Sequence, residues 1–369
     1  MRARKTTVGL HHQSGLTLVE IMVALTIGLV LTAGTIQLFV GSKQTYRLQE
    51  AMSRIQESGR FAIELLNEDL RWGGNIGCLS NMRRENPVGT GILAPGYFRV
   101  ALNNPNDFEW SLETAIQGHY WDGSNWQPTA VTLPAAVSGV ARADSDIVTI
   151  RGASSSGLIV TAHPGGSPPG SANIAVASGN GLQQNEVLLV GDCTSAAALQ
   201  ITNSNPDTSG SIVHDTGAVS SGPGNATKAL GREFVGADVM RLATRTYFIG
   251  TGVGGGPALF RRVNQSAVEE LVEGVSRMVI TYGVDTNANR EVDVYQTGAQ
   301  VEAGNNWGNV VSIRISLLLQ SDDGVTDAAQ YVTFNGASTT AAPGDRRMRD
   351  VYTTTIASRN RLPCTGLFQ

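Results

Sequence analysis

Charged residues, aromatics and cysteines are all scarce in this chain of 369 residues. Charged residues make up 16% and aromatics 6%, whereas Gly occurs 43 times, which favours short strands and polar loops over a helical bundle. The formal net charge of -4 argues against a protein that grips nucleic acid with its whole surface, because neutralising phosphates requires a basic face. We therefore expect a β-rich body and no nucleic-acid partner.

Motifs of catalytic chemistry are missing as well. The sequence has no GxSxG, no HExxH and no phosphate-binding glycine-rich loop that opens a helix, and its five histidines are scattered. There is no CxxC pair and no histidine at metal-ligand spacing, which argues against zinc and thioredoxin-like chemistry. We expect a protein that is not an enzyme and that has no cofactor and no metal centre.

Long hydrophobic runs are absent except for one at the amino terminus. Residues 16–40 contain a single charged residue, Glu20. At about 1.5 Å per residue, a helix of this length crosses the roughly 30 Å hydrocarbon core of a bilayer. Arg2, Arg4 and Lys5 precede the run without any acid, which predicts a cytoplasmic amino terminus and an exported body. The run lacks a good secretory cleavage site, so we expect it to stay attached, as in a signal anchor.

An amphipathic pattern continues beyond the apolar run. Apolar residues at three-, four- and seven-residue spacings predict a helix that packs one stripe onto a core and extends to about Trp72. The stripe consists of Leu48, Met52, Ile55, Ala62, Leu66 and Leu70. The paired glycines of "RWGGNIGC" then predict the end of the helix.

The remainder predicts a β-rich head. β-branched runs bounded by turn residues predict strands at 146–152, 157–163, 185–193, 198–204, 245–250, 258–263, 276–285, 310–321 and 350–358. Residues 164–181 and 204–231 are rich in Gly, Ser, Pro and Asn and are predicted to be long surface loops. The predicted organisation is 1–15 as a leader, 16–40 as a membrane helix, 41–72 as its amphipathic continuation and 73–369 as the head.

Three cysteines leave one disulfide and one free thiol if the head is exported. Cys78 follows the predicted helix and Cys193 ends a predicted strand, so we predict that these two pair and that Cys364 is free. A bridge across such a long loop would contribute about 4–5 kcal/mol in the chain-entropy model. Three buried, reduced thiols are the alternative, and sequence alone does not fix the connectivity.

Two polar segments could each be either a binding site or an ordinary part of the surface. Asp285, Asn287, Asn289 and Asp293 alternate like calcium ligands, but Arg290 replaces the turn glycine of that pattern, and a polar hairpin turn is the better account. Near the carboxyl end lie Arg346, Arg347, Arg349, Arg359 and Arg361, which suit either a basic patch or a solvated face paired with Asp345 and Asp350.

The segment "GLTLVE" at 15–20 resembles the processing site of type IV prepilins and type II secretion pseudopilins, with Leu16 where the family usually has Phe. The resemblance implies that a membrane prepilin peptidase cuts after Gly15 and methylates the new amine of Leu16. It also implies that Glu20 pairs with the terminal amine of a neighbouring subunit. A carboxylate in a bilayer needs such a partner. The simpler interpretation is a Glu20 that reaches the cytoplasmic boundary.

Several later stretches are similar to the PilW family of minor pilins. They include "LLVGDCTSAAALQIT", "ELVEGVSRMVITYGVDTN", "VVSIRISLLL" and "DVYTTTIASRNRL". The resemblance implies an α+β, pilin-like fold and a minor pilin that helps to initiate pilus assembly. Its implied partners are other minor pilins, the major pilin and a large tip adhesin. The implied location is the inner membrane of a Gram-negative bacterium with a periplasmic head, and afterwards the pilus tip.

Two rival interpretations remain open at this point. A minor pseudopilin of type II secretion would share the amino-terminal features. A single-span anchored periplasmic adhesin or enzyme would use the helix only as a tether. Whether the pilus would serve twitching, adhesion or DNA uptake is left open by the residues.

Overall fold

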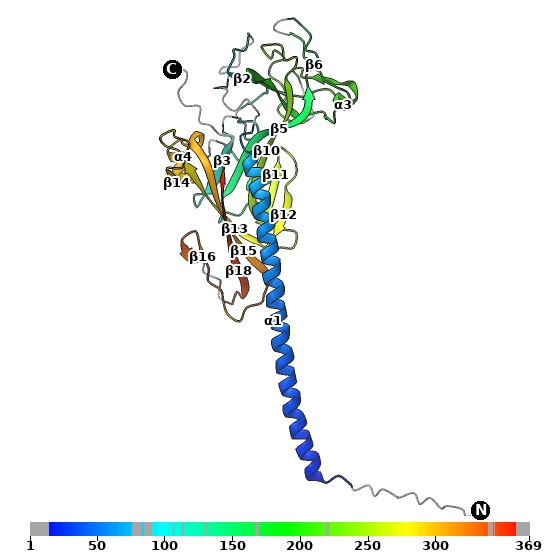
Figure 1. Ribbon diagram of the computed structural model, residues 1–369, viewed down its shortest axis with the longest axis vertical. Helices are drawn as coiled ribbons and strands as arrows, with labels where there is room; N and C mark the ends of the chain where they lie inside the picture. The colour runs from blue at the N-terminus through cyan, green and yellow to red at the C-terminus, as the bar shows by residue number, and fades with distance from the viewer. Residues whose placement is uncertain are drawn as a thin grey trace, which may run out of the picture. The chain divides into compact units, whose positions relative to one another are not determined.

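The computed structural model describes residues 15–75, 83–84, 91–105, 107–112, 114–129, 131–166, 170–217, 219, 221–338, 342 and 344–358. The chain divides into two compact units, Met1–Ser53 and Arg54–Gln369. A helix α1 (Leu18–Trp72) begins in the first unit and ends in the second, and strands dominate the rest of the chain (Figure 1). The predicted α+β, pilin-like fold is confirmed, and so is the end of the helix at Trp72.

The larger sheet of the second unit has ten strands. Its path is β1 (Arg83–Arg84), β2 (Tyr97–Val100), β8 (Ser195–Gln200), β7 (Val187–Asp192), β10 (Asp238–Thr251), β5 (Ile147–Ile159), β3 (Ile116–Trp121) and β4 (Trp126–Gln127). Strands β11 (Pro257–Val263) and β12 (Glu269–Glu273) continue from β10. Since β10 pairs with β5, β7 and β11, it is the central strand of this sheet.

The second sheet is antiparallel and has four strands. They follow the order β14 (Val294–Thr297), β13 (Val275–Val284), β15 (Val310–Gly324) and β18 (Arg347–Ala357). Short elements complete the unit: α2 (Ala135–Ser138), α3 (Pro206–Ser209), α4 (Gly298–Ala303), a 3-10 turn (Trp307–Asn309), and the pairs β6 (Asn173–Ala175) with β9 (Ser211–Val213) and β16 (Thr333–Phe334) with β17 (Ala337–Ser338).

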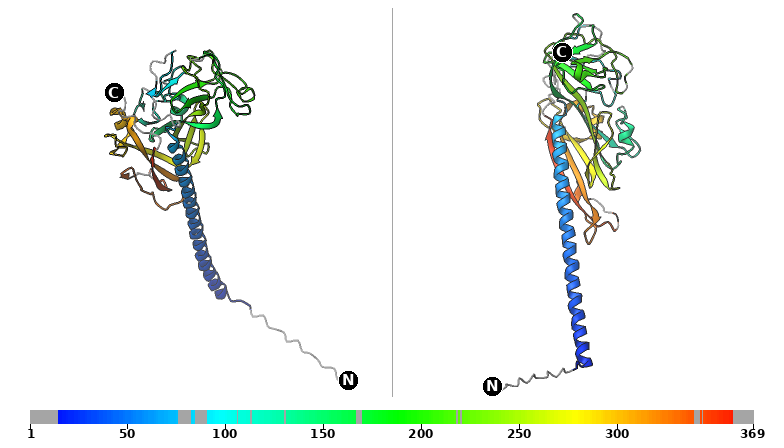
Figure 2. Two further views of the ribbon diagram at one scale, coloured as in Figure 1. Left: turned by 45° about the horizontal axis from the view of Figure 1, so that its top comes forward. Right: turned by 90° about the vertical axis from the view of Figure 1, so that its right-hand side faces the viewer.

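The carboxyl-terminal part of α1 provides one wall of the main core. Ile55, Ala62, Leu66 and Leu70 are buried in one cluster with apolar residues from both sheets. Figure 2 shows this part of α1 lying along the strands. Four members of the predicted stripe are thus confirmed, whereas Leu48 and Met52 are 38% and 46% exposed. These two precede Arg54, where the unit that contains the sheets begins.

Several strands differ from their predicted bounds because pairing partners extend them. The segment predicted at 146–152 and the first part of the one predicted at 157–163 belong to the single strand β5, and Ser154 and Ser155 between them pair with β10. The strand predicted at 198–204 is displaced to β8, because Asp192 accepts hydrogen bonds from the amides of Thr194 and Ser195 and closes a tight turn.

The two glycine-rich segments were predicted to be loops, and this is wrong in part. Each contributes one short strand, β6 or β9, and these strands pair with one another. The reason is a single isoleucine in each strand. Ile174 and Ile212 are fully buried in a second core cluster, which the polar composition around them did not indicate.

Candidate functional site

The first part of α1, residues 18–40, is an apolar helix segment whose side chains are all exposed. Leu16 is 76% exposed and Leu38 is also 76% exposed, and the apolar side chains between them are exposed on every side of the helix. Only α1, among the described residues, is a helix long and apolar enough to cross a membrane. A helix that is apolar all round requires a lipid or a protein environment.

Gly15 and Leu16 lie immediately before this helix. Both residues are exposed and outside regular secondary structure, since α1 begins at Leu18. A peptide bond that is to be cut must enter the cleft of a peptidase in an extended form, which a bond inside a helix cannot do. The predicted cleavage position therefore lies where the backbone is accessible.

Glu20 has a local partner in the single chain. Its carboxylate accepts hydrogen bonds from the amide and the hydroxyl of Thr17, at 2.9 and 2.8 Å, and the Thr17 hydroxyl in turn accepts from the Glu20 amide at 3.3 Å. This reciprocal arrangement is a capping box at the start of α1. The sequence-based interpretation considered a partner on another subunit or a position at the cytoplasmic boundary and missed Thr17, although the spacing T-x-x-E is the signal for such a box.

Comparison with known families adds to this geometry. Residues 10–36 match the Prokaryotic N-terminal methylation motif, and residues 246–360 match the family described as Type IV Pilus-assembly protein W. The chain matches a PilW-family, type IV pilin-like protein. No curated protein and no solved structure matches it. The motif and the single apolar helix fit a membrane-anchored pilin with a role in pilus biogenesis.

Polar contacts fasten α1 of this PilW-like chain to its larger sheet. The Asp69 carboxylate accepts a hydrogen bond from the Tyr247 hydroxyl and forms ion pairs with Arg245 at 3.4 Å and Arg261 at 3.6 Å. Arg245 also lies over the Trp72 ring, 4.0 Å from its centre. Burial raises the pKa of Asp69, an effect that the two arginines oppose. Sequence reasoning did not find this network, because its members are distant in the chain.

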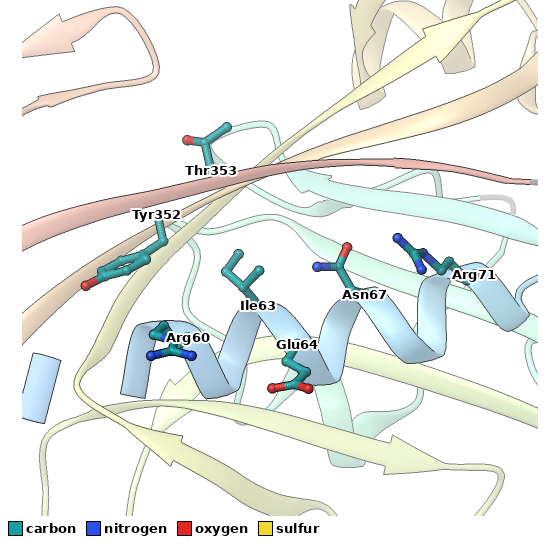
Figure 3. Close-up of a pocket in the computed structure, with 7 residues that line it drawn as sticks. All are labelled: Arg60, Ile63, Glu64, Asn67, Arg71, Tyr352 and Thr353. Carbon is teal, nitrogen blue, oxygen red and sulfur yellow. The ribbon is translucent and has the colours of Figure 1, made fainter. Parts of the chain in front are cut away.

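A groove runs between α1 and the edge strand β18. It has a volume of about 460 Å³ and is lined by Arg60, Ile63, Glu64, Asn67, Arg71, Tyr352 and Thr353. In Figure 3, Ile63 and Asn67 point from α1 toward β18. The lining is mostly polar and carries both signs of charge, which suits a protein segment better than an apolar ligand.

Of the two cysteines predicted to form a disulfide, only Cys193 is among the described residues. Cys193 is disulfide-bonded. Cys78 and Cys364 both lie outside the described residues. A bonded Cys193 agrees with an oxidising compartment, and its pairing with Cys78 stays a prediction.

The Asp285–Asp293 segment joins β13 to β14, and its carboxylates bind the loop itself. Asp285 accepts hydrogen bonds from the amides of Asn287, Ala288 and Arg290, and Asp293 accepts from Thr286 and Asn287. Across the described parts of the chain, no group of three or more His, Cys, Asp or Glu is arranged to hold a metal ion. Asn289 uses its side chain for the amide of Glu291. Calcium binding was the less favoured interpretation of this segment, and it stays untested.

Two of the five carboxyl-terminal arginines, Arg347 and Arg349, are paired, and no ion pair of Arg346 is found among the described residues. Asp345 forms an ion pair with Arg347 at 3.9 Å and a closer one with Arg349. Arg359 and Arg361 lie outside the described residues. The pairing predicted with Asp345 is present, whereas Asp350 accepts a hydrogen bond from the Val351 amide instead.

Three buried polar side chains in the head were not singled out from the sequence. Arg151 is 1% exposed and donates to the carbonyl oxygens of Phe108 and Thr114 and to Gln117 Oε1. His119 and His214 are also buried, and burial lowers their pKa values to about 3 and about 4. The only sequence signal was that Arg151 interrupts an otherwise apolar strand.

Proposed function

We propose that this chain is a minor type IV pilin that is cut after Gly15 and helps to initiate pilus assembly in a tip or priming complex with other minor pilins. The observation that carries the proposal is the position of Glu20, five residues into the chain that would begin at Leu16, on a helix whose apolar surface is exposed all round. The two family matches support it. We propose no catalytic activity for the chain itself.

The proposed sequence of events uses the same helix twice. Before assembly it anchors the chain in the inner membrane of a Gram-negative bacterium, with the head in the periplasm. After cleavage by the prepilin peptidase and methylation of Leu16, the helix packs among those of other pilins, the major pilin included. At the pilus tip, a large adhesin would be a further partner. The Thr17–Glu20 hydrogen bonds keep the carboxylate partnered until a neighbouring amine replaces them.

Mass spectrometry of the purified mature protein tests the processing step. We expect an amino terminus at Leu16 that carries a methyl group. An intact Met1, or cleavage near Gly34, would show that the chain is an anchored protein of another kind. Deletion of the prepilin peptidase gene is the control, because the same cells should then yield only the uncut chain.

Two substitutions at Glu20 separate its charge from its capping role. Glu20→Gln keeps an oxygen that can accept from Thr17, whereas Glu20→Ala removes both the charge and the cap. If an amine on another subunit is the functional partner, both variants should still insert into the membrane and be cut after Gly15. About tenfold less partner pilin should co-purify with each of them, because the amine of the neighbouring subunit is then left unpaired in the bilayer, which is costly. Wild-type recovery with Glu20→Gln would show that only the cap matters.

A further inference from the structure

Strand β18 forms one border of the four-stranded sheet. It is 11 residues long, and in the described part of the chain it pairs only with β15. It lies within the segment that matches the PilW family. An edge strand offers a row of backbone donors and acceptors to any second strand that can reach it.

Two hydrogen bonds fix which amides of β18 point toward β15. The Ser358 amide donates to the Val311 carbonyl oxygen at 2.9 Å, and the Met348 amide donates to Ser321 Oγ, also at 2.9 Å. Backbone groups alternate in direction along an antiparallel strand. Even-numbered residues of β18 therefore face β15, and odd-numbered residues face away from the sheet.

The outward amides at the start of β18 already have acceptors. Arg349 donates to Gln330 Oε1 at 2.9 Å, and Val351 donates to Asp350 Oδ1 at 2.8 Å. Side chains thus close this end of the edge, in the way that natural sheets protect their borders.

The other end of the edge is open. Thr353, Thr355 and Ala357 are exposed, and within the described residues their outward amides have no hydrogen-bond acceptor. Between Thr353 and Ala357 there is no charged residue, no proline and no shift of register. These are the devices that keep an edge strand from pairing with another chain. Their absence leaves an accessible edge of five residues, 353–357.

The open edge adjoins the groove along α1. A strand that paired with β18 would turn alternate side chains toward α1, where Arg60, Glu64 and Asn67 line the groove. A volume of about 460 Å³ holds a few short side chains. Charges of both signs on the wall favour polar or charged side chains at those positions.

We propose that the open edge of β18 receives an extended strand from another pilus subunit, with short polar or charged side chains at alternate positions facing α1. Main-chain hydrogen bonds to Thr353, Thr355 and Ala357 would supply the affinity, and the groove would select the sequence. This inference rests on the proposed function, since it names the surface through which the head meets a partner.

Hydrogen exchange on the full-length chain in detergent tests this directly. The chain is compared alone and co-purified with the major and minor pilins of its own system. We expect amide exchange of residues 353–357 to slow at least tenfold in the complex. Unchanged exchange there in an otherwise intact complex would overturn the inference and leave the proposed function standing. Failure of the pilins to co-purify at all would count against both.

A pair of substitutions at one position separates backbone from side chain. Thr353→Pro removes an outward amide at an edge, where proline is tolerated, while Thr353→Ala keeps it. We expect about a tenfold loss of partner binding for Thr353→Pro and no more than a twofold change for Thr353→Ala. Equal effects would overturn the inference, and near-UV circular dichroism establishes that both variants fold. A further outcome is that exchange at 353–357 slows when the concentration of the chain alone is raised. That result would show that the strand on the edge comes from a second copy of this chain, and it would overturn the assignment to another pilus subunit.

Discussion

Arg151 illustrates how a single buried residue holds a long connection in place. It lies on β5, yet it contacts the segment between β2 and β3 by donating twice to Phe108 and once to Thr114. The guanidinium also lies 5.4 Å from the centre of the Phe108 ring. Burial lowers the pKa of Arg151 to about 10, which leaves the group charged at neutral pH. Carbonyl dipoles and one amide oxygen, rather than an ion pair, thus satisfy its donors.

Replacing this side chain should destabilise the head. Arg151→Met is expected to lower the free energy of unfolding by about 2–3 kcal/mol, because buried carbonyl groups lose their donors. Urea unfolding of the full chain in detergent measures this. The matched control is Arg142→Met, which removes an exposed ion pair with Asp144 and should change stability by less than about 0.5 kcal/mol. A loss equal to that of the control would contradict the assigned role.

At the scale of elements, α1 is held to the head by two different kinds of contact. Leu66 and Leu70 bury apolar surface against the sheets, which is the non-specific contribution. Asp69 faces Tyr247, Arg245 and Arg261, and this polar group fixes the rotation of the helix about its axis. The apolar stripe was readable from spacing, whereas the polar network required the strands to be brought together.

Asp69→Asn should loosen this attachment. The amide oxygen still accepts from Tyr247, but Arg245 loses its counter-charge and Arg261 keeps only Glu269, so we expect a loss of about 1–2 kcal/mol in the free energy of unfolding. Glu57→Gln, an exposed change on the same helix, is the matched control. Thermal unfolding followed by far-UV circular dichroism distinguishes the two variants, and equal midpoints would contradict the network's role.

At the scale of the whole molecule, buried titratable groups make stability depend on pH. His119 and His214 are kept neutral by burial, with pKa values of about 3 and about 4, so the unfolded chain takes up more protons below pH 6.5. Burial raises the pKa of Asp146 to about 6, so the folded chain takes up one proton between pH 6 and 4. The histidines therefore destabilise the fold as pH falls, and Asp146 partly offsets them.

Together, these three groups contribute one proton in favour of the unfolded state between pH 6 and 4. We expect the free energy of unfolding to fall by about 1.4 kcal/mol for each pH unit in this window. Urea unfolding at a series of pH values measures the slope. His119→Gln should flatten it and Asp146→Asn should steepen it, so identical slopes in the two variants would contradict this assignment.

The sequence by itself determined the amino-terminal helix and its boundaries. A helix with a continuous apolar surface, a glycine before it and one acid within it are local features, so periodicity and motif were sufficient to predict α1, its end at Trp72 and the cleavage position. Strands with a clear run of apolar or β-branched residues, such as β11, β13 and β15, were predicted to within three residues for the same reason.

Only the tertiary structure decided which polar residues have partners. The Asp69 network, the donors of Arg151 and the open edge of β18 depend on segments far apart in the chain, and no local pattern encodes such pairings. Polar strands such as the serine-rich end of β5 form because β10 supplies their hydrogen bonds. Local chemistry fixed the apolar helix, whereas long-range strand pairing created the open edge of β18.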